Sequence, residues 1–176
     1  MIIRILLPAT ILLLSVLANY SQNSASPQIP DAAMKGVLHF TDGKSSTTLE
    51  RLSDKRVIVV LFEPWCGPCW MQAESLEKLR NETCGKGFTI IGLSGEDSPM
   101  EKAELRRTIK KLGYKFEFAW TDKATLESLM SITRISAIPQ TFLIANGKLE
   151  AYFMGGSARH FENISKHVKE KWAGKE

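Results

Sequence analysis

The sequence lacks any block of charge of one sign. Its 23 lysine and arginine residues are interspersed with 19 aspartate and glutamate residues, and the formal net charge is +4. Proteins that track a phosphate backbone cluster their basic residues, so we expect no nucleic acid partner. Internal repeats and long low-complexity tracts are also lacking, while 44% hydrophobic and 24% charged residues are ordinary values for a globular protein. Disordered, collagen-like and multispanning membrane proteins are therefore excluded.

Metal-ligating side chains are scarce. The chain has three cysteines and three histidines, at Cys66, Cys69, Cys84, His39, His160 and His167. A zinc knuckle needs two further ligands at suitable spacing from a Cys-x-x-Cys pair, and these scattered residues do not supply them. We therefore expect no metal and no other cofactor.

The N-terminus carries an uncharged apolar run, from residue 5 to residue 18, directly after Arg4. As a helix this run would span about 21 Å, short of the roughly 30 Å hydrocarbon core of a membrane. We predict a signal peptide over residues 1–18, with an uncleaved anchor as the alternative. Residues 19–33 are polar and contain two prolines, which predicts a flexible linker before a domain at 34–176. Both alternatives place that domain outside the cytoplasm.

The rest of the chain alternates apolar strands with amphipathic helices. An uninterrupted β-branched run at 57–62 predicts a central strand buried on both faces. Further strands are expected at 88–93 and 116–120, helices at 69–84, 105–112, 125–132 and 157–172, and hairpins at 36–52 and 140–154. The pattern predicts an α/β domain with a central mixed β-sheet flanked by helices and an N-terminal β-hairpin.

The run Trp65-Cys66-Gly67-Pro68-Cys69 stands where the central strand meets the first long helix. A cysteine at a helix N-terminus is stabilised as the thiolate by unpaired N–H groups and the helix dipole. We therefore expect Cys66 to attack a substrate disulfide and Cys69 to resolve the adduct, with Gly67 and Pro68 shaping the turn between them. A static structural disulfide is the alternative, although such bridges usually close longer loops.

Cys84 makes the number of cysteines odd. On a continuous helix it would lie roughly 22 Å from Cys69, whereas the Cα atoms of a disulfide lie within about 7 Å. We expect a buried or idle thiol at Cys84, with an intermolecular bridge as the alternative.

The Trp65–Cys69 motif, the buried strand before it, and Ile138-Pro139 followed by the strand 140–145 resemble the thioredoxin superfamily. The N-terminal hairpin, the extra segment between residues 112 and 132 and the export signal are similar to the TlpA/ResA type. The resemblance implies a thioredoxin-like fold and an extracytoplasmic thiol-disulfide oxidoreductase. Several members of that branch serve cytochrome c maturation.

The resemblance also implies roles for single residues. Pro139 would be the cis-proline that lies opposite the cysteines and helps to bind an extended client peptide, and Trp65 would belong to the surface that the client meets. Two positions depart from the family: Val60 stands where thioredoxin has a buried acid, and Gln72 where ResA-like proteins commonly have glutamate. The proton acceptor for Cys69 is therefore open.

Two side chains beside the motif each have two possible roles. Glu63 is the nearest carboxylate in the sequence and could accept a proton through a water, or it could be a solvated charge at the end of the strand. Trp70 stands where the family has a polar or basic residue, and could contact the client or fill the core.

The Gly-Pro pair between the cysteines matches thioredoxin, a reductant with a potential of about −270 mV. The resemblance therefore implies that the protein reduces disulfides of exported clients, such as apocytochrome c, and is re-reduced by a membrane-embedded thiol reductase. A disulfide oxidase or isomerase and a non-enzymatic binding or chaperone domain are the alternatives. A peroxidase of the peroxiredoxin kind would need its cysteine in a Pro-Thr-rich loop, and Pro64-Trp65-Cys66 does not supply one.

Overall fold

The computed structural model describes residues 27–95 and 99–172, so the predicted signal peptide at 1–18 lies outside the described residues. The strands are β1 (Leu38–Phe40), β2 (Ser46–Thr47), β3 (Arg56–Leu61), β4 (Thr89–Gly95), β5 (Glu117–Thr121), β6 (Gln140–Ala145) and β7 (Lys148–Met154). The helices are α2 (Asp31–Lys35), α3 (Gly67–Glu82), α4 (Pro99–Leu112), α5 (Lys123–Thr133) and α6 (Ala158–His167), with short turns η1 (Glu50–Leu52) and η2 (Val168–Trp172). None of the helices in this described part is long and apolar enough to cross a membrane.

The strands form a single mixed sheet in the order β2-β1-β5-β4-β3-β6-β7. β3, β4 and β5 are parallel neighbours, whereas the other pairs are antiparallel. The predicted sheet and both predicted hairpins are confirmed. Asn146 and Gly147 have φ of 52° and 68° at the turn between β6 and β7, which are the left-handed values that a tight hairpin requires.

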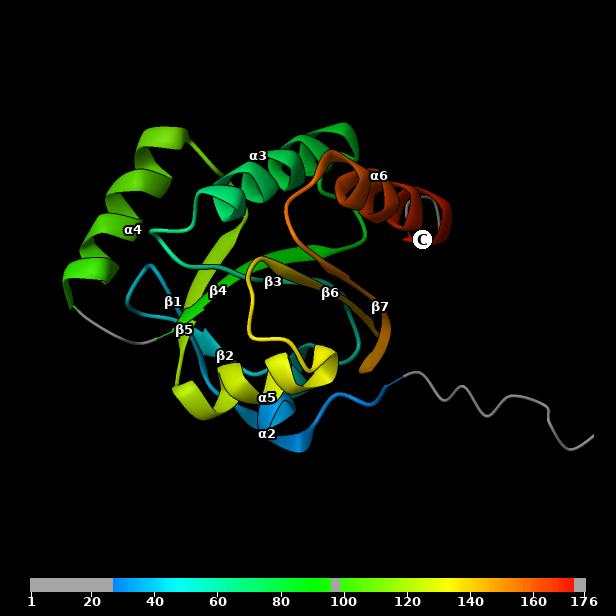
Figure 1. The fold of residues 1–176 in the computed structure, drawn as a ribbon, viewed down its shortest axis with the longest axis horizontal. Helices are drawn as coiled ribbons and strands as arrows, with labels where there is room; N and C mark the ends of the chain where they lie inside the picture. The colour runs from blue at the N-terminus through cyan, green and yellow to red at the C-terminus, as the bar shows by residue number, and fades with distance from the viewer. Residues whose placement is uncertain (1–26, 96–98, 173–176) are drawn as a thin grey trace, which may run out of the picture.

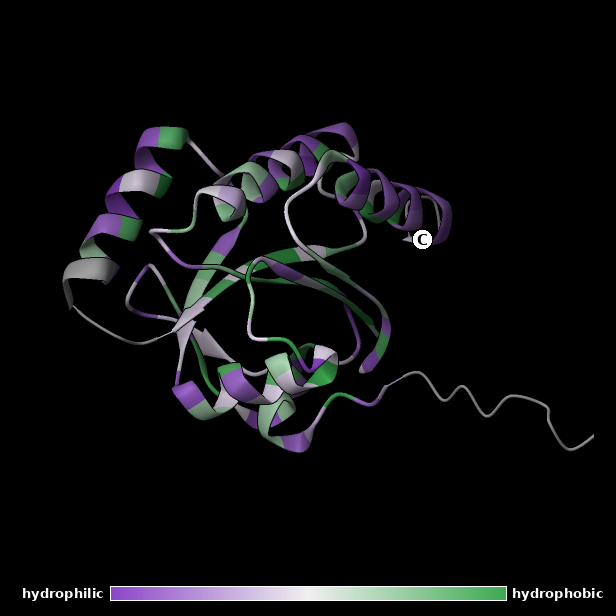
Figure 2. Cartoon of the chain, in the orientation of Figure 1, coloured by the Kyte–Doolittle hydropathy of each residue, from purple (hydrophilic) through white to green (hydrophobic). Residues whose placement is uncertain are grey.

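Helices cover both faces of the sheet (Figure 1). α3, α4 and α6 lie on one face, and α2 and α5 lie on the other. Two apolar clusters follow from this arrangement, one on each face, because alternate residues of β3 point to opposite sides: Ile58 and Val60 to the first, Val57 and Val59 to the second. Figure 2 shows the same division, with hydrophobic residues along the central strands and hydrophilic residues on the outward turns of α3, α4 and α6.

The folded part begins earlier than the sequence suggested. α2 starts at Asp31, within the segment 19–33 expected to be a linker, and Ala33 is fully buried against the second cluster. A helix of five residues is too short to show an apolar periodicity, and its side chain at Ala33 is small, so nothing in the sequence distinguished it from the tether.

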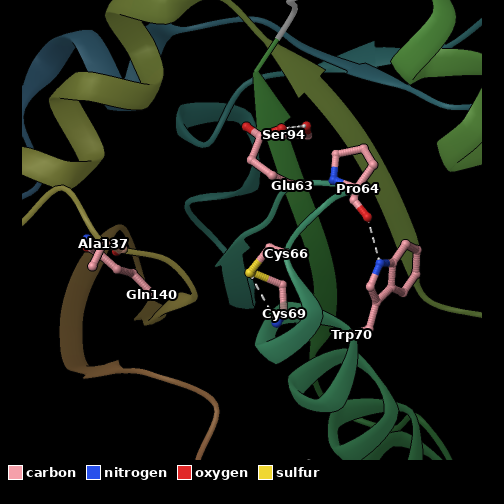
Figure 3. The surroundings of a disulfide bond; sticks show 8 residues. All are labelled: Glu63, Pro64, Cys66, Cys69, Trp70, Ser94, Ala137 and Gln140. Carbon is pink, nitrogen blue, oxygen red and sulfur yellow. Dashed lines mark hydrogen bonds between the residues drawn. A yellow bond between two sulfur atoms is a disulfide. The ribbon is translucent and has the colours of Figure 1, made fainter.

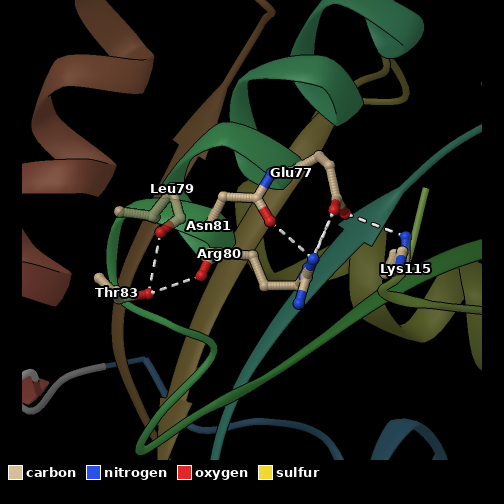
Figure 4. Close-up of polar contacts among 6 residues, drawn as sticks. All are labelled: Glu77, Leu79, Arg80, Asn81, Thr83 and Lys115. Carbon is tan, nitrogen blue, oxygen red and sulfur yellow. Dashed lines mark hydrogen bonds and ion pairs between the residues drawn. The ribbon is translucent and has the colours of Figure 1, made fainter. Parts of the chain in front are cut away.

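A partly buried carboxylate near the middle of α3 connects this helix to the segment before β5 (Figure 4). Glu77 accepts hydrogen bonds from the Arg80 guanidinium, at 3.0 and 2.7 Å, and from the backbone N–H of Lys115, at 3.1 Å, just before β5. Burial alone would raise the pKa of Glu77, but the hydrogen bonds from Arg80 and Lys115 outweigh it and the pKa is lowered. The helix that begins at the cysteines is thereby fixed against the sheet.

The end of α3 carries the third cysteine. Cys84 and Gly85 both have left-handed backbone angles, with φ of 55° and 64°, which stop the helix close to the predicted position. Cys84 is exposed and forms no disulfide within this chain, so the expectation of a buried thiol is wrong. An idle thiol and an intermolecular bridge both stay predictions.

Candidate active site

Cys66 and Cys69 form a disulfide at the junction of β3 and α3, with their Cα atoms 5.2 Å apart. The apolar strand ends at Leu61, and Cys66 is the N-cap residue of α3, with an extended backbone at φ −87° and ψ 99°. Proline is well suited to the first turn of a helix because its missing N–H would have no partner there, and Pro68 occupies that turn. The predicted position of the pair is confirmed.

The first turn of α3 favours negative charge on Cys66. The backbone N–H of Cys69 lies 3.2 Å from the Cys66 sulfur and donates to it, and no acidic residue lies in this turn to oppose the helix dipole. Cys66 is 5% exposed and Cys69 is fully buried. The arrangement can therefore stabilise a thiolate at Cys66 while covering the second sulfur.

The two tryptophans beside the pair have different surroundings. Trp65 is 71% exposed and adjoins the exposed Gly67 and Pro68, so it belongs to the surface around Cys66. Trp70 instead packs into the core, with its ring 4.6 Å from that of Phe62. Its indole N–H donates to the Pro64 carbonyl at 2.9 Å, which holds the segment before the disulfide (Figure 3). Of the two roles expected for Trp70, the contacts favour the core.

Pro139 lies at the same end of the sheet as the disulfide. β6 pairs with β3 so that Gln140 faces Leu61, and Pro139 therefore borders the segment that leads to Cys66. The Ile138–Pro139 peptide bond is cis, as the resemblance implies, and the Pro139 carbonyl accepts from the Gly155 N–H at 2.8 Å.

The turn after β7 completes the surroundings of the pair. A Cβ atom at Gly156 would lie 2.5 Å from the Pro68 carbonyl oxygen, so only glycine allows this turn to rest on the first turn of α3. The fold therefore brings together Trp65, Cys66, Gly67, Pro68, Cys69 and Pro139, and Glu63 stands just before them.

Glu63 is anchored to the neighbouring strand. Its carboxylate accepts from the Ser94 hydroxyl at 3.0 Å and from the Gly95 N–H at 3.1 Å, both at the end of β4. In Figure 3 the side chain points toward Ser94 and away from the sulfur atoms. These contacts join the ends of two parallel strands, and they favour a structural role over a solvated charge.

The two positions that depart from the family are both buried. Val60 is 2% exposed within the core under α3. Gln72, one helical turn beyond Cys69, is 1% exposed, and neither atom of its amide has a hydrogen-bond partner among the described residues. Neither a valine side chain nor an uncharged amide is a base, so neither position supplies the proton acceptor for Cys69.

Gln140 is a site residue that sequence reasoning missed. Its side chain is fully buried directly after Pro139 and makes three hydrogen bonds, to Thr133, Ile135 and Ala137. Its one signal in the sequence is a glutamine at the first position of a strand that continues into an apolar run.

No group of three or more histidine, cysteine or acidic side chains that could hold a metal occurs among residues 27–95 and 99–172. Within the described residues, the candidate site therefore consists of the cysteine pair and the side chains around it.

Comparison with known proteins gives one family and several relatives. The model of the AhpC/TSA family matches residues 26–152. A thioredoxin from Haemophilus influenzae is 32% identical over 71 residues, which is 40% of this chain and 64% of that protein, so the match spans a little under two thirds of the relative.

Solved structures share the fold. A thiol:disulfide interchange protein of the thioredoxin family from Chlorobium tepidum has a TM-score of 0.63 and 20% identity, over 76% of this chain and 90% of that one. StoA from Bacillus subtilis has a TM-score of 0.57 and 16% identity, over 74% of this chain and 92% of that one. The thioredoxin-like α/β fold expected from the sequence is thereby confirmed.

Proposed function

Since the chain belongs to the AhpC/TSA family, we propose that it is a thiol-disulfide oxidoreductase whose working groups are Cys66 and Cys69. The observation that carries the proposal is the disulfide itself: it closes at a helix N-terminus, with Cys66 as the cap and Cys69 covered one turn later. A bridge between residues three apart constrains the chain little, so a purely structural role would contribute little stability.

The proposed order of attack follows from the position of Cys66 at the N-terminus of α3, with Cys69 fully buried behind it. In the reduced protein the Cys66 thiolate attacks one sulfur of a client disulfide, the client S–S bond breaks, and the other client sulfur leaves as a thiolate. Cys69 then loses its proton and attacks the Cys66 sulfur of the mixed disulfide, which releases the second client thiolate. The client gains two electrons, and the protein is left with the Cys66–Cys69 disulfide.

The finer parts of the proposal concern direction, clients and location. The Gly67-Pro68 pair favours reduction of the client, by its likeness to thioredoxin, and the apolar run after Arg4 favours export. The clients would be disulfide-containing exported proteins, including apocytochrome c in cytochrome c maturation. A membrane-embedded thiol reductase would restore the dithiol. Pro139 and Trp65 would contact the client.

Insulin reduction tests the activity. The wild-type protein, recycled by dithiothreitol, should precipitate insulin, whereas Cys66→Ser and Cys69→Ser should lower the rate to the background. Cys84→Ser is the matched control, because Cys84 is exposed and free at the other end of α3, and it should keep the wild-type rate. Full activity in Cys66→Ser would remove the proposal, and consumption of hydrogen peroxide without insulin reduction would favour the peroxidase alternative.

Clients and location are tested together. Cys69→Ser cannot resolve the mixed disulfide, so it should accumulate adducts on Cys66 that reducing agent releases. Recovery of exported proteins in those adducts supports the proposed location, and recovery of cytoplasmic proteins alone contradicts it.

A further inference from the structure

A single side chain holds the loop that leads to Pro139. Gln140 uses both amide N–H bonds on loop carbonyls, donating to Ile135 at 2.6 Å and to Ala137 at 2.8 Å. Its amide oxygen accepts from the Thr133 hydroxyl at 2.9 Å, and that hydroxyl also accepts from the Ile135 N–H at 3.3 Å. Three positions of a short segment are thus tied to one fully buried amide.

Apart from Gln140 and Thr133, the loop is held at Ile138, which packs against both apolar clusters. Residues 134–137 are exposed, and Arg134 has a left-handed backbone with φ of 59° at the end of α5. Among the described residues, none accepts a hydrogen bond from the backbone N–H of Ser136, Ala137 or Ile138. Both carbonyls that face Gln140 accept from the same side-chain nitrogen, so their oxygens lie closer together than those of residues i and i+2 in an extended strand, and the backbone bends between them.

The loop stands beside the disulfide. In Figure 3 Ala137 and Gln140 lie to the left of the turn that carries Cys66 and Cys69. Pro139 joins the loop to β6, whose first residue, Gln140, pairs with Leu61 at the end of the strand before that turn. None of the hydrogen bonds of Gln140 ends on a cysteine. Gln140 is therefore placed to set the shape of the loop without touching the sulfur atoms.

We propose that Gln140 is a positioning residue that fixes the 134–138 loop, so that the loop presents the backbone N–H groups of Ser136, Ala137 and Ile138 to a client segment beside Cys66. The proposal rests on the proposed function, because it assigns a client to that site. An extended peptide that pairs with main-chain groups needs those groups in place beforehand, since ordering them on binding would cost affinity. Loss of the Gln140 contacts should therefore weaken client binding and leave the cysteine chemistry unchanged.

Two sets of variants separate these effects. Gln140→Leu removes all three hydrogen bonds while keeping an apolar filling for a fully buried site. Thr133→Val removes the hydroxyl that donates to the Gln140 amide and accepts from the Ile135 N–H. Thr133→Ser keeps that hydroxyl, so it should behave as the wild type. If Gln140→Leu does not fold, Thr133→Val and Thr133→Ser still test the proposal.

The first measurement is native proteolysis of the oxidised protein, and it needs no client. Trypsin cleaves after Arg134 only when the loop opens, and the rate follows the population of the open form. Gln140→Leu should raise cleavage after Arg134 at least about fivefold relative to cleavage after Lys78 in α3, with a smaller rise in Thr133→Val. An unchanged ratio in both variants overturns the proposal.

The second measurement is steady-state insulin reduction. Gln140→Leu should raise KM about fivefold with kcat changed less than about twofold, and its equilibrium constant with glutathione should stay within about twofold of the wild type. A shifted equilibrium constant with an unchanged KM overturns the proposal. A wild-type protein that does not reduce insulin contradicts the proposed function instead, and the cleavage ratio then still decides whether Gln140 holds the loop.

Discussion

Two buried glutamines lie near the Cys66–Cys69 disulfide, and their amides differ in hydrogen bonding. Gln140, on the sheet side, is fully buried, and both N–H groups and the oxygen of its amide form hydrogen bonds with the segment before Pro139. Gln72, on the helix side, is 1% exposed and its amide has no partner among the described residues. A buried polar group costs free energy unless it is hydrogen-bonded. Hydrogen bonds therefore fix the Gln140 side chain in place, whereas packing without a hydrogen bond holds the Gln72 side chain.

The largest effect on stability should come from the bonded glutamine. Gln140→Met keeps the volume of the side chain and removes three hydrogen bonds, which leaves the Thr133 hydroxyl and two carbonyls without their partner. We expect a loss of about 2–3 kcal/mol in the free energy of unfolding, measured by urea denaturation of the oxidised protein with an unchanged m-value. A loss below about 0.5 kcal/mol would mean that water replaces the amide fully.

The helix side also has a hydrogen-bonded anchor, farther along α3, and acid should release it. The pKa of Glu77 is lowered in the folded protein, so its stabilising contribution is complete above the ordinary value of 4.5 and is lost as the pH falls through the lowered pKa. Glu77→Gln should cost about 1 kcal/mol at neutral pH and less at about pH 3. Urea midpoints of both proteins across this range measure the difference. A constant difference would contradict the lowered pKa.

The same substitution at the unpartnered glutamine should have the opposite sign. Gln72→Met fills the same space and removes an amide that has no partner, so the oxidised protein should be unchanged or up to about 1 kcal/mol more stable. The matched Gln140→Met variant makes the comparison direct. A loss at Gln72 as large as the loss at Gln140 would show that the Gln72 amide is bonded and would break the contrast.

The smallest effect is expected at Glu63, which belongs to neither side. Because its carboxylate is held by Ser94 and Gly95, Glu63→Gln should leave the pH dependence of insulin reduction unaltered. The pH profile of kcat for the two proteins measures this. A shift of the profile by about one unit would instead make Glu63 the proton acceptor for Cys69.

Local patterns in the sequence were sufficient for most of the fold. The β-branched run at 57–62 predicts the strand buried on both faces. The hairpin predicted at 140–154 turns at Asn146-Gly147, and the Ser157 hydroxyl caps the helix predicted from residue 157. Each of these signals acts over a few residues, which is the range over which periodicity and turn chemistry are informative. The short helix α2 was missed because five residues give no periodicity.

The polar framework of the site could not be predicted in the same way. Glu63 meets Ser94 from 31 residues away, and that contact exists only because β3 and β4 are neighbours in the sheet. Gln140 lies close in sequence to its partners, but they reach it only because the chain turns back between α5 and β6. Side-chain hydrogen bonds of this kind depend on tertiary structure, and no sequence pattern around a glutamine in a strand predicts them.

The central claim is that Cys66 and Cys69 form an exchangeable, reducing pair, and the most direct measurement is equilibration with a glutathione redox buffer. The oxidised fraction should follow one two-electron transition with a potential of about −270 mV, in Cys84→Ser as in the wild type. A potential of about −120 mV would make the protein an oxidant, and a disulfide that does not equilibrate at all would make it structural.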